Sequence, residues 1–336
     1  ILEVAGYTTD DQNDSHVAAV IACIYLYISI FGDDPSRKLP SMVVTCRSQL
    51  PIGAGLGSSA AYSVCLAAAF LDARGVIGDV DNDTKRWDKV AIDLINEWAF
   101  IGEKVIHGTP SGIDNSISSY GGALRFVKGQ SPVPLKRVPQ LRVLLVNTKV
   151  PRSTKQLVAS VRNKRNKFPD IMDPILRSMH SLSDMMEQVL VDLGGDDRSI
   201  DLGATETHLE ELIDLNQHLL NTLGVGHAAL DDVCTITSSH GAHAKLTGAG
   251  GGGCAFIYLR AGITKETMQN LKDELESEDF YVWETTVGSQ GVTADDLLTK
   301  LSKTSVKKIK RKQSFLDWAT NPTVKSMASE QQKRLP

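Results

Sequence analysis

Three glycines lie within five residues at Gly53, Gly55 and Gly57, directly before the hydroxyl pair Ser58 and Ser59. Glycine has no Cβ atom, so a ligand can come close to the backbone at these positions. The unpaired N–H groups at the start of a helix attract anions, above all phosphate. A serine hydroxyl there can bind phosphate or a metal ion. The loop therefore predicts a phosphate-binding site, with a flexible turn as the alternative.

Two familiar nucleotide-binding loops can be compared with this segment letter by letter. A P-loop needs a lysine before the Ser or Thr that ends its glycine segment. No lysine occurs between Pro51 and Leu71, which excludes a P-loop. The letters GLGSSA at residues 55–60 satisfy the loose dinucleotide-binding pattern, so a dehydrogenase is a weak alternative.

Two carboxylates follow the glycine loop, Glu103 within a long apolar pattern and Asp114 within PSGIDN. A carboxylate within hydrogen-bond reach of a substrate hydroxyl can accept its proton or orient it. Carboxylate oxygens are also ligands that Mg²⁺ prefers. Each residue has an ordinary alternative, because Asp114 could cap a helix and Glu103 could be a partly exposed helix residue. His107 is predicted to be a packed or capping histidine.

A second glycine run has five glycines between Gly248 and Gly253 and precedes an apolar stretch, CAFIYL. So many glycines indicate that the backbone passes close to a ligand or to another backbone, and tight packing alone is the alternative. The candidates for substrate or loop contacts are Thr154, Thr247, Gly248, Ala249 and Gly250. The two threonines could equally bond their own backbone in turns.

Hydrophobic patterns predict the elements that position these residues. Residues 41–49 are rich in β-branched side chains and predict a strand, and a helix is predicted from Ser58 to Gly75. Apolar residues at helical spacing predict a second helix within 87–108. The first domain is therefore expected to contain a strand, the glycine loop and a helix, in that order.

A connector with three prolines at residues 128–140 places the predicted domain boundary near Val138. Beyond it, we expect a strand at 141–150, helices within 153–193 and 206–223, and a strand, a helix and a strand at 254–260, 265–277 and 280–287. The second domain is therefore predicted to be α+β. The predicted domains are residues 1–137 and 138–302, followed by a disordered basic tail at 303–336.

Composition favours an ordinary globular protein, with 42% hydrophobic and 23% charged residues in 336. No signal peptide or membrane span is predicted, and we expect a soluble intracellular protein with reduced thiols.

The tail from Lys303 has nine Lys or Arg and two Asp or Glu, a net charge of +7, which leaves −11 for residues 1–302. The acidic body argues against nucleic-acid binding, and the tail is predicted to be a solvated segment, with an anionic partner or targeting as alternatives.

The segments PIGAGLGSSAAY, HGTPSGIDN and KLTGAGGGGCAF closely resemble motifs of the GHMP kinases and occur in the family's order. The resemblance extends to about residue 300. It implies a two-domain α+β fold with a ferredoxin-like C-terminal domain. The family opens with Pro-Gly-Lys and a nearby Gly-Glu-His, which this sequence lacks, so we expect an N-terminal domain truncated at its start.

The same resemblance implies roles for the candidate residues. Ser59 and Glu103 would hold Mg²⁺, and Asp114 would be the catalytic carboxylate. The ATP phosphates would lie on Gly53, Ala54, Gly55, Leu56, Gly57, Ser58 and Ser59.

The segments at residues 96–126 and 144–162 are most similar to the family members that phosphorylate mevalonate for isoprenoid and sterol synthesis. A phosphomevalonate or sugar kinase, or a non-catalytic nucleotide- or partner-binding form, is the alternative. The family further implies a homodimer, feedback inhibition by farnesyl or geranyl diphosphate, and a location in the cytoplasm, with the peroxisome as the alternative. No membrane or nucleic-acid partner is expected.

Overall fold

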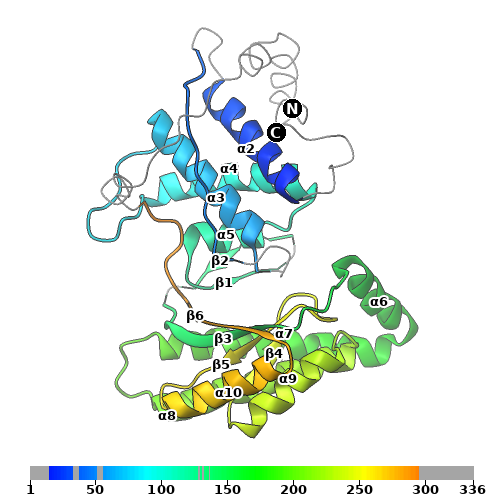
Figure 1. The fold of residues 1–336 in the computed structure, drawn as a ribbon. Helices are drawn as coiled ribbons and strands as arrows, with labels where there is room; N and C mark the ends of the chain where they lie inside the picture. Colours follow the sequence, from blue (N-terminus) through cyan, green and yellow to red (C-terminus); the bar gives the residue numbers. More distant parts are fainter. Residues whose placement is uncertain are drawn as a thin grey trace. The chain divides into compact units, whose positions relative to one another are not determined.

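The computed structural model describes the chain in two compact units (Figure 1). The described residues are 15–32, 38–50, 56–127, 129–130, 132–135 and 137–294. The first unit comprises Ile1–Arg47, Ser59–Tyr120 and Gly291–Pro336, and the second comprises Ser48–Ser58 and Gly121–Gln290. The boundary near Val138 stays a prediction, and the basic tail lies outside the described residues.

The first unit is built from helices. They are α2 (Ser15–Phe31), α3 (Ser58–Arg74), α4 (Lys89–His107) and α5 (Ile113–Tyr120). The start of α3 at Ser58 and its end before Gly75, whose φ is +71°, confirm the predicted helix. The helix predicted within 87–108 is confirmed as α4. Asp88 is its N-cap residue, and the Asp88 side chain accepts a hydrogen bond from the Ala91 N–H.

Helix α2 is apolar on almost every side and supplies part of the core of the first unit. Its side chains Leu26 and Ile30 pack with Phe70 of α3 and Ile95 of α4, and all four are almost fully buried. A helix that is apolar all round is expected in a protein core or in a membrane. Within the described ranges, no helix is long and apolar enough to cross a membrane.

The strand predicted at residues 41–49 is wrong. The structure describes these residues and gives them no strand, and their side chains are exposed. β-Branched residues favour a strand only where a neighbouring strand accepts the backbone hydrogen bonds. None of the strands in the described ranges pairs with this segment. Residues 41–49, which precede the glycine loop in the sequence, therefore form no strand among the described residues.

The second unit contains an antiparallel four-stranded sheet with the order β4-β5-β3-β6. The strands are β3 (Leu141–Asn147), β4 (His243–Leu246), β5 (Cys254–Tyr258) and β6 (Tyr281–Val287). Leu145 at the centre of β3 lies opposite Phe256 of β5 and Trp283 of β6. A separate two-stranded sheet pairs β1 (Leu124–Arg125) with β2 (Val133–Pro134).

Five helices complete the second unit: α6 (Thr154–Lys167), α7 (Pro169–Leu193), α8 (Leu202–Leu223), α9 (Ala228–Ser239) and α10 (Lys265–Ser277). The chain runs from strand β3 through helices α6–α9 to β4 and β5, and then through α10 to β6. This strand order confirms the ferredoxin-like α+β domain. Helix α9 and strand β4 were not predicted.

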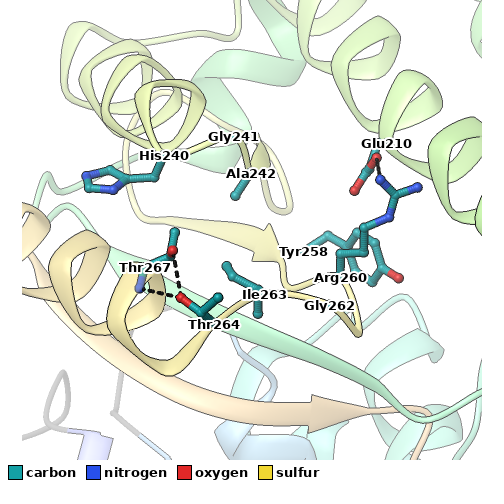
Figure 2. Close-up of a pocket in the computed structure, with 10 residues that line it drawn as sticks. All are labelled: Glu210, His240, Gly241, Ala242, Tyr258, Arg260, Gly262, Ile263, Thr264 and Thr267. Atoms are coloured by element: carbon teal, nitrogen blue, oxygen red, sulfur yellow. Dashed lines mark hydrogen bonds and ion pairs between the residues drawn. The ribbon is translucent and has the colours of Figure 1, made fainter.

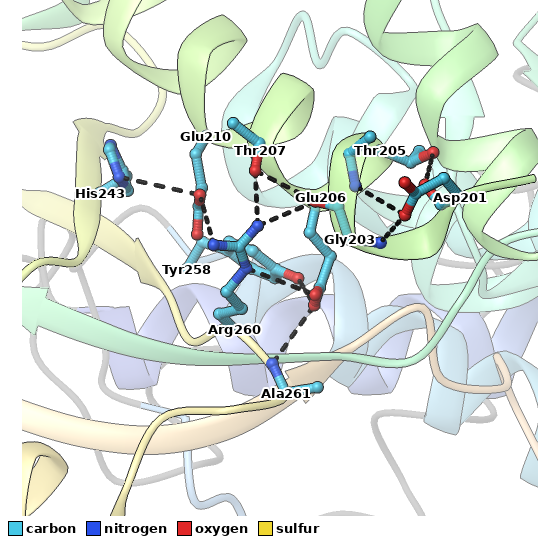
Figure 3. Close-up of polar contacts among 11 residues, drawn as sticks. Asp201, Gly203, Thr205, Glu206, Thr207, Glu210, His243, Tyr258, Arg260 and Ala261 are labelled. Carbon is cyan, nitrogen blue, oxygen red and sulfur yellow. Dashed lines mark hydrogen bonds and ion pairs between the residues drawn. The ribbon is translucent and has the colours of Figure 1, made fainter.

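Successive side chains of a strand point to opposite faces of the sheet. In this sheet the side chains on both faces are buried. Ile257 packs with Leu230 of α9 and Leu271 of α10, whereas its neighbour Tyr258 packs with Leu212 of α8. Helix α8 is also attached to strand β5 by polar contacts (Figure 3). Arg260 forms ion pairs with Glu206 at 3.4 Å and Glu210 at 3.5 Å, and Tyr258 donates a hydrogen bond of 2.7 Å to Glu206.

Candidate functional site

The described part of the first glycine loop delivers the chain to the N-terminus of helix α3. Gly57 has a φ of +70°, a left-handed conformation that favours glycine. Helix α3 has no acidic residue in its first turn, so no side-chain carboxylate there competes with an anion for its free N–H groups. Leu56, Gly57, Ser58 and Ser59 are placed here, and Gly53, Ala54 and Gly55 lie outside the described residues.

A cluster of polar side chains joins helices α3 and α4. Ser59 Oγ donates a hydrogen bond of 3.2 Å to Glu103 Oε2, and Ser63 Oγ donates one of 3.4 Å to Oε1. His107 Nε2 lies 3.0 Å from Ser59 Oγ and 4.0 Å from Glu103 Oε2. Ser59 and Ser63 are one turn apart on α3, as Glu103 and His107 are on α4, so each helix presents both side chains on one face. The cluster lies at the start of α3, beside its free N–H groups.

Glu103 is a buried carboxylate, only 4% exposed. Burial raises its pKa above the usual range, and His107 and the two serine hydroxyls act in the opposite direction. The negative charge of Asp114 acts on the Glu103 pKa in the same direction as burial does. The charge of Glu103 is therefore only partly compensated by the protein.

The donor atoms of this cluster fit Mg²⁺. In the part of the chain that the structure describes, no group of three His, Cys, Asp or Glu side chains could hold a metal ion. Mg²⁺ does not require such a group, because it is commonly held by one or two protein oxygens together with phosphate oxygens and water. The Ser59 hydroxyl and the Glu103 carboxylate supply two such oxygens, and a cation would compensate the buried charge.

Asp114 lies inside helix α5, whose first residue is Ile113. The helix N-terminus is served by Ser111, because the Ile113 N–H donates a hydrogen bond of 3.3 Å to Ser111 Oγ. The alternative prediction of Asp114 as a cap is therefore wrong. Its side chain is exposed, and the preceding Gly112 turns the chain with a φ of +83°. Asp114 is thus presented to solvent near the buried Glu103.

The second glycine run, in the second unit, is packed against neighbouring backbone and side chains. A Cβ atom at Gly250 would lie 2.1 Å from the Val225 carbonyl oxygen, and one at Gly252 would lie 2.6 Å from Val150 Cγ1. Gly251 N–H donates a hydrogen bond of 2.7 Å to the same Val225 oxygen. Close packing against neighbouring atoms therefore accounts for these glycines, which agrees with the alternative prediction of tight packing.

The remaining candidates surround that run. Thr247 Oγ1 donates to the Cys254 carbonyl oxygen at 3.0 Å, so this hydroxyl bonds the backbone of its own loop. Arg152 Nη1 donates to the Thr247 carbonyl oxygen at 2.9 Å. Thr154 is exposed at the first turn of α6, and Ala249 is half-buried. Contacts of these residues with a substrate stay a prediction.

Comparison with known proteins identifies the family. Residues 18–122 match the model of the GHMP kinases N terminal domain, and residues 205–282 match that of the GHMP kinases C terminal domain. The mevalonate kinase of Bos taurus is 50% identical over 297 residues, which cover 87% of this chain and 72% of that protein. The chain belongs to the mevalonate kinases of the GHMP kinase family. The Homo sapiens mevalonate kinase is 49% identical over 299 residues, with the same shares of each chain.

Solved mevalonate kinases share the fold of this GHMP kinase. The L. major enzyme in complex with R-mevalonate gives a TM-score of 0.60 at 20% identity, covering 83% of this chain and 80% of that one. The Methanococcus jannaschii enzyme gives a TM-score of 0.61 at 22% identity, covering 84% and 77%. The two-domain fold implied by the sequence motifs is confirmed.

One cavity of this kinase is not lined by residues of the candidate site. It has a volume of about 240 Å³ and lies in the second unit (Figure 2). Its ionisable side chains are already paired, Arg260 with Glu210 and His240 with Glu274 at 2.7 Å. None of the residues that the motifs single out lines it.

Two residues that the sequence did not single out for chemistry contact candidate residues, one in each unit. His107 contacts Ser59, and Arg152 contacts the second glycine run. The spacing of four residues between Glu103 and His107 on one helix was a usable indication, because such residues share a helix face. Nothing in the sequence indicated the partner of Arg152.

Proposed function

We propose that this protein transfers the γ-phosphoryl group of ATP to the 5-hydroxyl group of mevalonate. The proposal rests on the buried Glu103 carboxylate, which meets the Ser59 hydroxyl at the N-terminus of α3. Identity of 50% to a mevalonate kinase over 87% of the chain supports the choice of substrate. Phosphoryl transfer requires positioned oxygens and neutralised phosphate charge, and these two residues would hold the Mg²⁺ ion that neutralises that charge.

Each residue of the site has a proposed part in this reaction. The N–H groups at the start of α3 bind the ATP phosphates, together with Ser58 and the glycine loop. Ser59 and Glu103 hold Mg²⁺, which neutralises phosphate charge when bound. The exposed Asp114 accepts the proton of the substrate hydroxyl or orients that hydroxyl for attack. His107 hydrogen-bonds Ser59 and keeps its hydroxyl beside Glu103.

Turnover of a substrate panel tests the proposal. The protein is incubated with ATP, Mg²⁺ and one of mevalonate, phosphomevalonate, galactose or homoserine, and ADP release is measured. We expect mevalonate to be used with the highest kcat/KM. Preferential turnover of another acceptor would assign a different substrate to the site.

Regulation and assembly are proposed on the same basis. A diphosphate can occupy an anion site that binds a triphosphate, so farnesyl or geranyl diphosphate should compete with ATP at the start of α3. Simultaneous binding of farnesyl diphosphate and ATP in a calorimetric titration would contradict this. We also propose a homodimer located in the cytoplasm, which light scattering and localisation of the tagged protein can test.

A further inference from the structure

Helix α5, which carries Asp114, is attached to its surroundings mainly by polar side chains. It has only eight residues, and its buried residues are Asn115, Ser116 and Ser119. A helix this short is not stable alone and depends on tertiary contacts. Tyr120 at its end packs against the apolar core, and its fully buried residues are all polar, so directional hydrogen bonds also set its position.

Asn115 and Asn96 form the central contact between α5 and α4. Asn115 is 2% exposed, and its Nδ2 donates a hydrogen bond of 2.7 Å to Asn96 Oδ1. The same Nδ2 lies 3.4 Å from the Asn96 carbonyl oxygen, and Ser119 Oγ donates to Asn96 Oδ1 at 3.5 Å. The amide nitrogen of Asn115 thus faces two oxygens, and Asn96 Oδ1 receives two donors. These contacts agree on the orientation of both amides.

The position of Asn96 on α4 connects this contact to the candidate site. Asn96 precedes Glu103 by seven residues, so both side chains lie on a similar face of one helix, two turns apart. Asn115 directly follows Asp114. One rigid helix therefore carries the metal-ligand candidate Glu103 and, through Asn96, holds the segment that carries Asp114.

We propose that Asn96 is a positioning residue for phosphoryl transfer, which fixes the Asp114 carboxylate relative to Glu103 by its hydrogen bond with Asn115. This inference rests on the proposed function, in which Asp114 acts on the substrate hydroxyl. Asn96 itself does not touch the substrate.

Replacement of Asn96 by Ala tests this role. It removes the 2.7 Å side-chain acceptor of the buried Asn115 amide, which keeps only the 3.4 Å contact with the Asn96 carbonyl oxygen, and this poorly satisfied donor favours displacement of α5. A displacement of about 1 Å at a reacting group can lower turnover ~100-fold. We expect Asn96→Ala to lower kcat about 10- to 100-fold, with the KM for ATP changed less than about threefold, because α3 and the phosphate loop are untouched.

The matched control is Tyr120→Phe. It removes the hydrogen bond of 2.7 Å that the Tyr120 hydroxyl donates to Asp93 of α4, and the contact of that hydroxyl with the Asn96 side chain, but it leaves the Asn96–Asn115 hydrogen bond in place. Tyr120 lies at the other end of α5, about 9 Å along the helix from Asp114. If proximity to Asp114 is what matters, Tyr120→Phe keeps kcat within about threefold of the unsubstituted protein. An equal loss of kcat in both variants overturns the inference, because any loosening of α5 would then suffice.

A double-mutant cycle separates positioning from general damage. If Asn96 acts through Asp114, Asn96→Ala lowers kcat in the unsubstituted protein and has no further effect in Asp114→Asn. Additive losses overturn the inference. Hydrogen exchange of the first half of α5 provides a readout independent of turnover. Asn96→Ala should accelerate this exchange and Tyr120→Phe should not, and unchanged exchange in Asn96→Ala overturns the inference.

The two proposals fail in distinguishable ways. If the protein does not phosphorylate mevalonate, or if Asp114→Asn turns over normally, the proposed function fails. The exchange measurement still decides whether Asn96 holds α5.

Discussion

Replacement of Glu103 by Gln removes a buried charge and almost preserves the shape of the side chain. Burial raises the pKa of Glu103, which means that the folded protein disfavours the ionised carboxylate relative to the neutral carboxyl. Gln resembles the neutral form and can still face the Ser59 and Ser63 hydroxyls. We therefore expect Glu103→Gln to increase the stability of the metal-free protein at pH 7 while impairing its function.

The pH dependence follows from the direction of the shift. A carboxyl whose folded pKa lies above its unfolded value binds more protons in the folded state. Stability is therefore lost as the pH rises from the ordinary value of 4.5 through the raised pKa of Glu103. Gln does not titrate, so its advantage over Glu should grow as the pH rises through the raised pKa of Glu103 and should vanish towards pH 4.5.

The size of the gain can be bounded from the environment of Glu103. Stabilising substitutions of this kind commonly contribute about 0.5–2 kcal/mol. The weaker hydrogen bonds of the neutral amide to two serines offset part of this gain. We expect about 1 kcal/mol, which corresponds to a rise in Tm of about 2–4 °C in the unit that contains Glu103.

Thermal unfolding with EDTA between pH 4.5 and 7.5 measures this effect, with Glu210→Gln as the matched control. Glu210 is also buried, 7% exposed, but it lies 3.5 Å from Arg260 Nη1, so its neutralisation should lower the Tm. A lower Tm for Glu103→Gln at pH 7, or a difference that does not shrink on acidification, would refute the reasoning. In turnover assays Glu103→Gln should need more Mg²⁺, and a defect indifferent to Mg²⁺ would remove Glu103 from the metal site.

The remaining predictions concern catalysis, the serine contact and the glycine run. Asp114→Asn should lower kcat ~10²- to 10⁴-fold with an unchanged Kd for ATP, because it loses the proton acceptor, and near-normal turnover would remove Asp114 from catalysis. His107→Ala should raise the calorimetric Kd for Mg²⁺-ATP about fivefold, because it removes the 3.0 Å contact with Ser59. His107→Gln should restore most of the affinity for Mg²⁺-ATP. An equal loss of affinity in both variants would show that the contact with Ser59 does not support binding. Gly250→Ala should lower the unfolding free energy in denaturant titrations by at least ~2 kcal/mol, because the new Cβ meets a carbonyl oxygen at 2.1 Å. Gly241→Ala, with a similar φ of +68° and no atom within 4 Å of the new Cβ, should lose only about 1 kcal/mol, and an equal loss would show that the close contact is relieved without cost.

The sequence predicted the elements that have a strong periodic pattern. Helix α4 has an apolar stripe over five turns, and α3 ends at a glycine with positive φ, so both were predicted within two residues. Strand β3 and the strand-helix-strand order near the end of the second unit were also predictable from local sequence. The segment 41–49 has strand composition without a partner strand in the described residues, and composition alone cannot supply that information.

The candidate site was predictable where a residue belongs to a motif and unpredictable where it acts through a distant neighbour. Ser59 and Glu103 are 44 residues apart and were predicted together only because the family resemblance pairs them. Asn96 looks like any polar residue on a helix, and its role depends on the fold that brings Asn115 to 2.7 Å. Long-range contacts of this kind are set by helix packing, which local patterns do not specify.

The packing of the second glycine run has a consequence at the level of the gene. Every single-base missense change in a glycine codon encodes a residue with a Cβ atom. At Gly250, Gly251, Gly252 and Gly253 that atom would lie within 2.8 Å of a neighbouring atom, and each backbone has a positive φ. No one-step missense variant at these four codons is therefore sterically neutral, and we expect variants found there in sequenced populations to reduce the amount of folded protein.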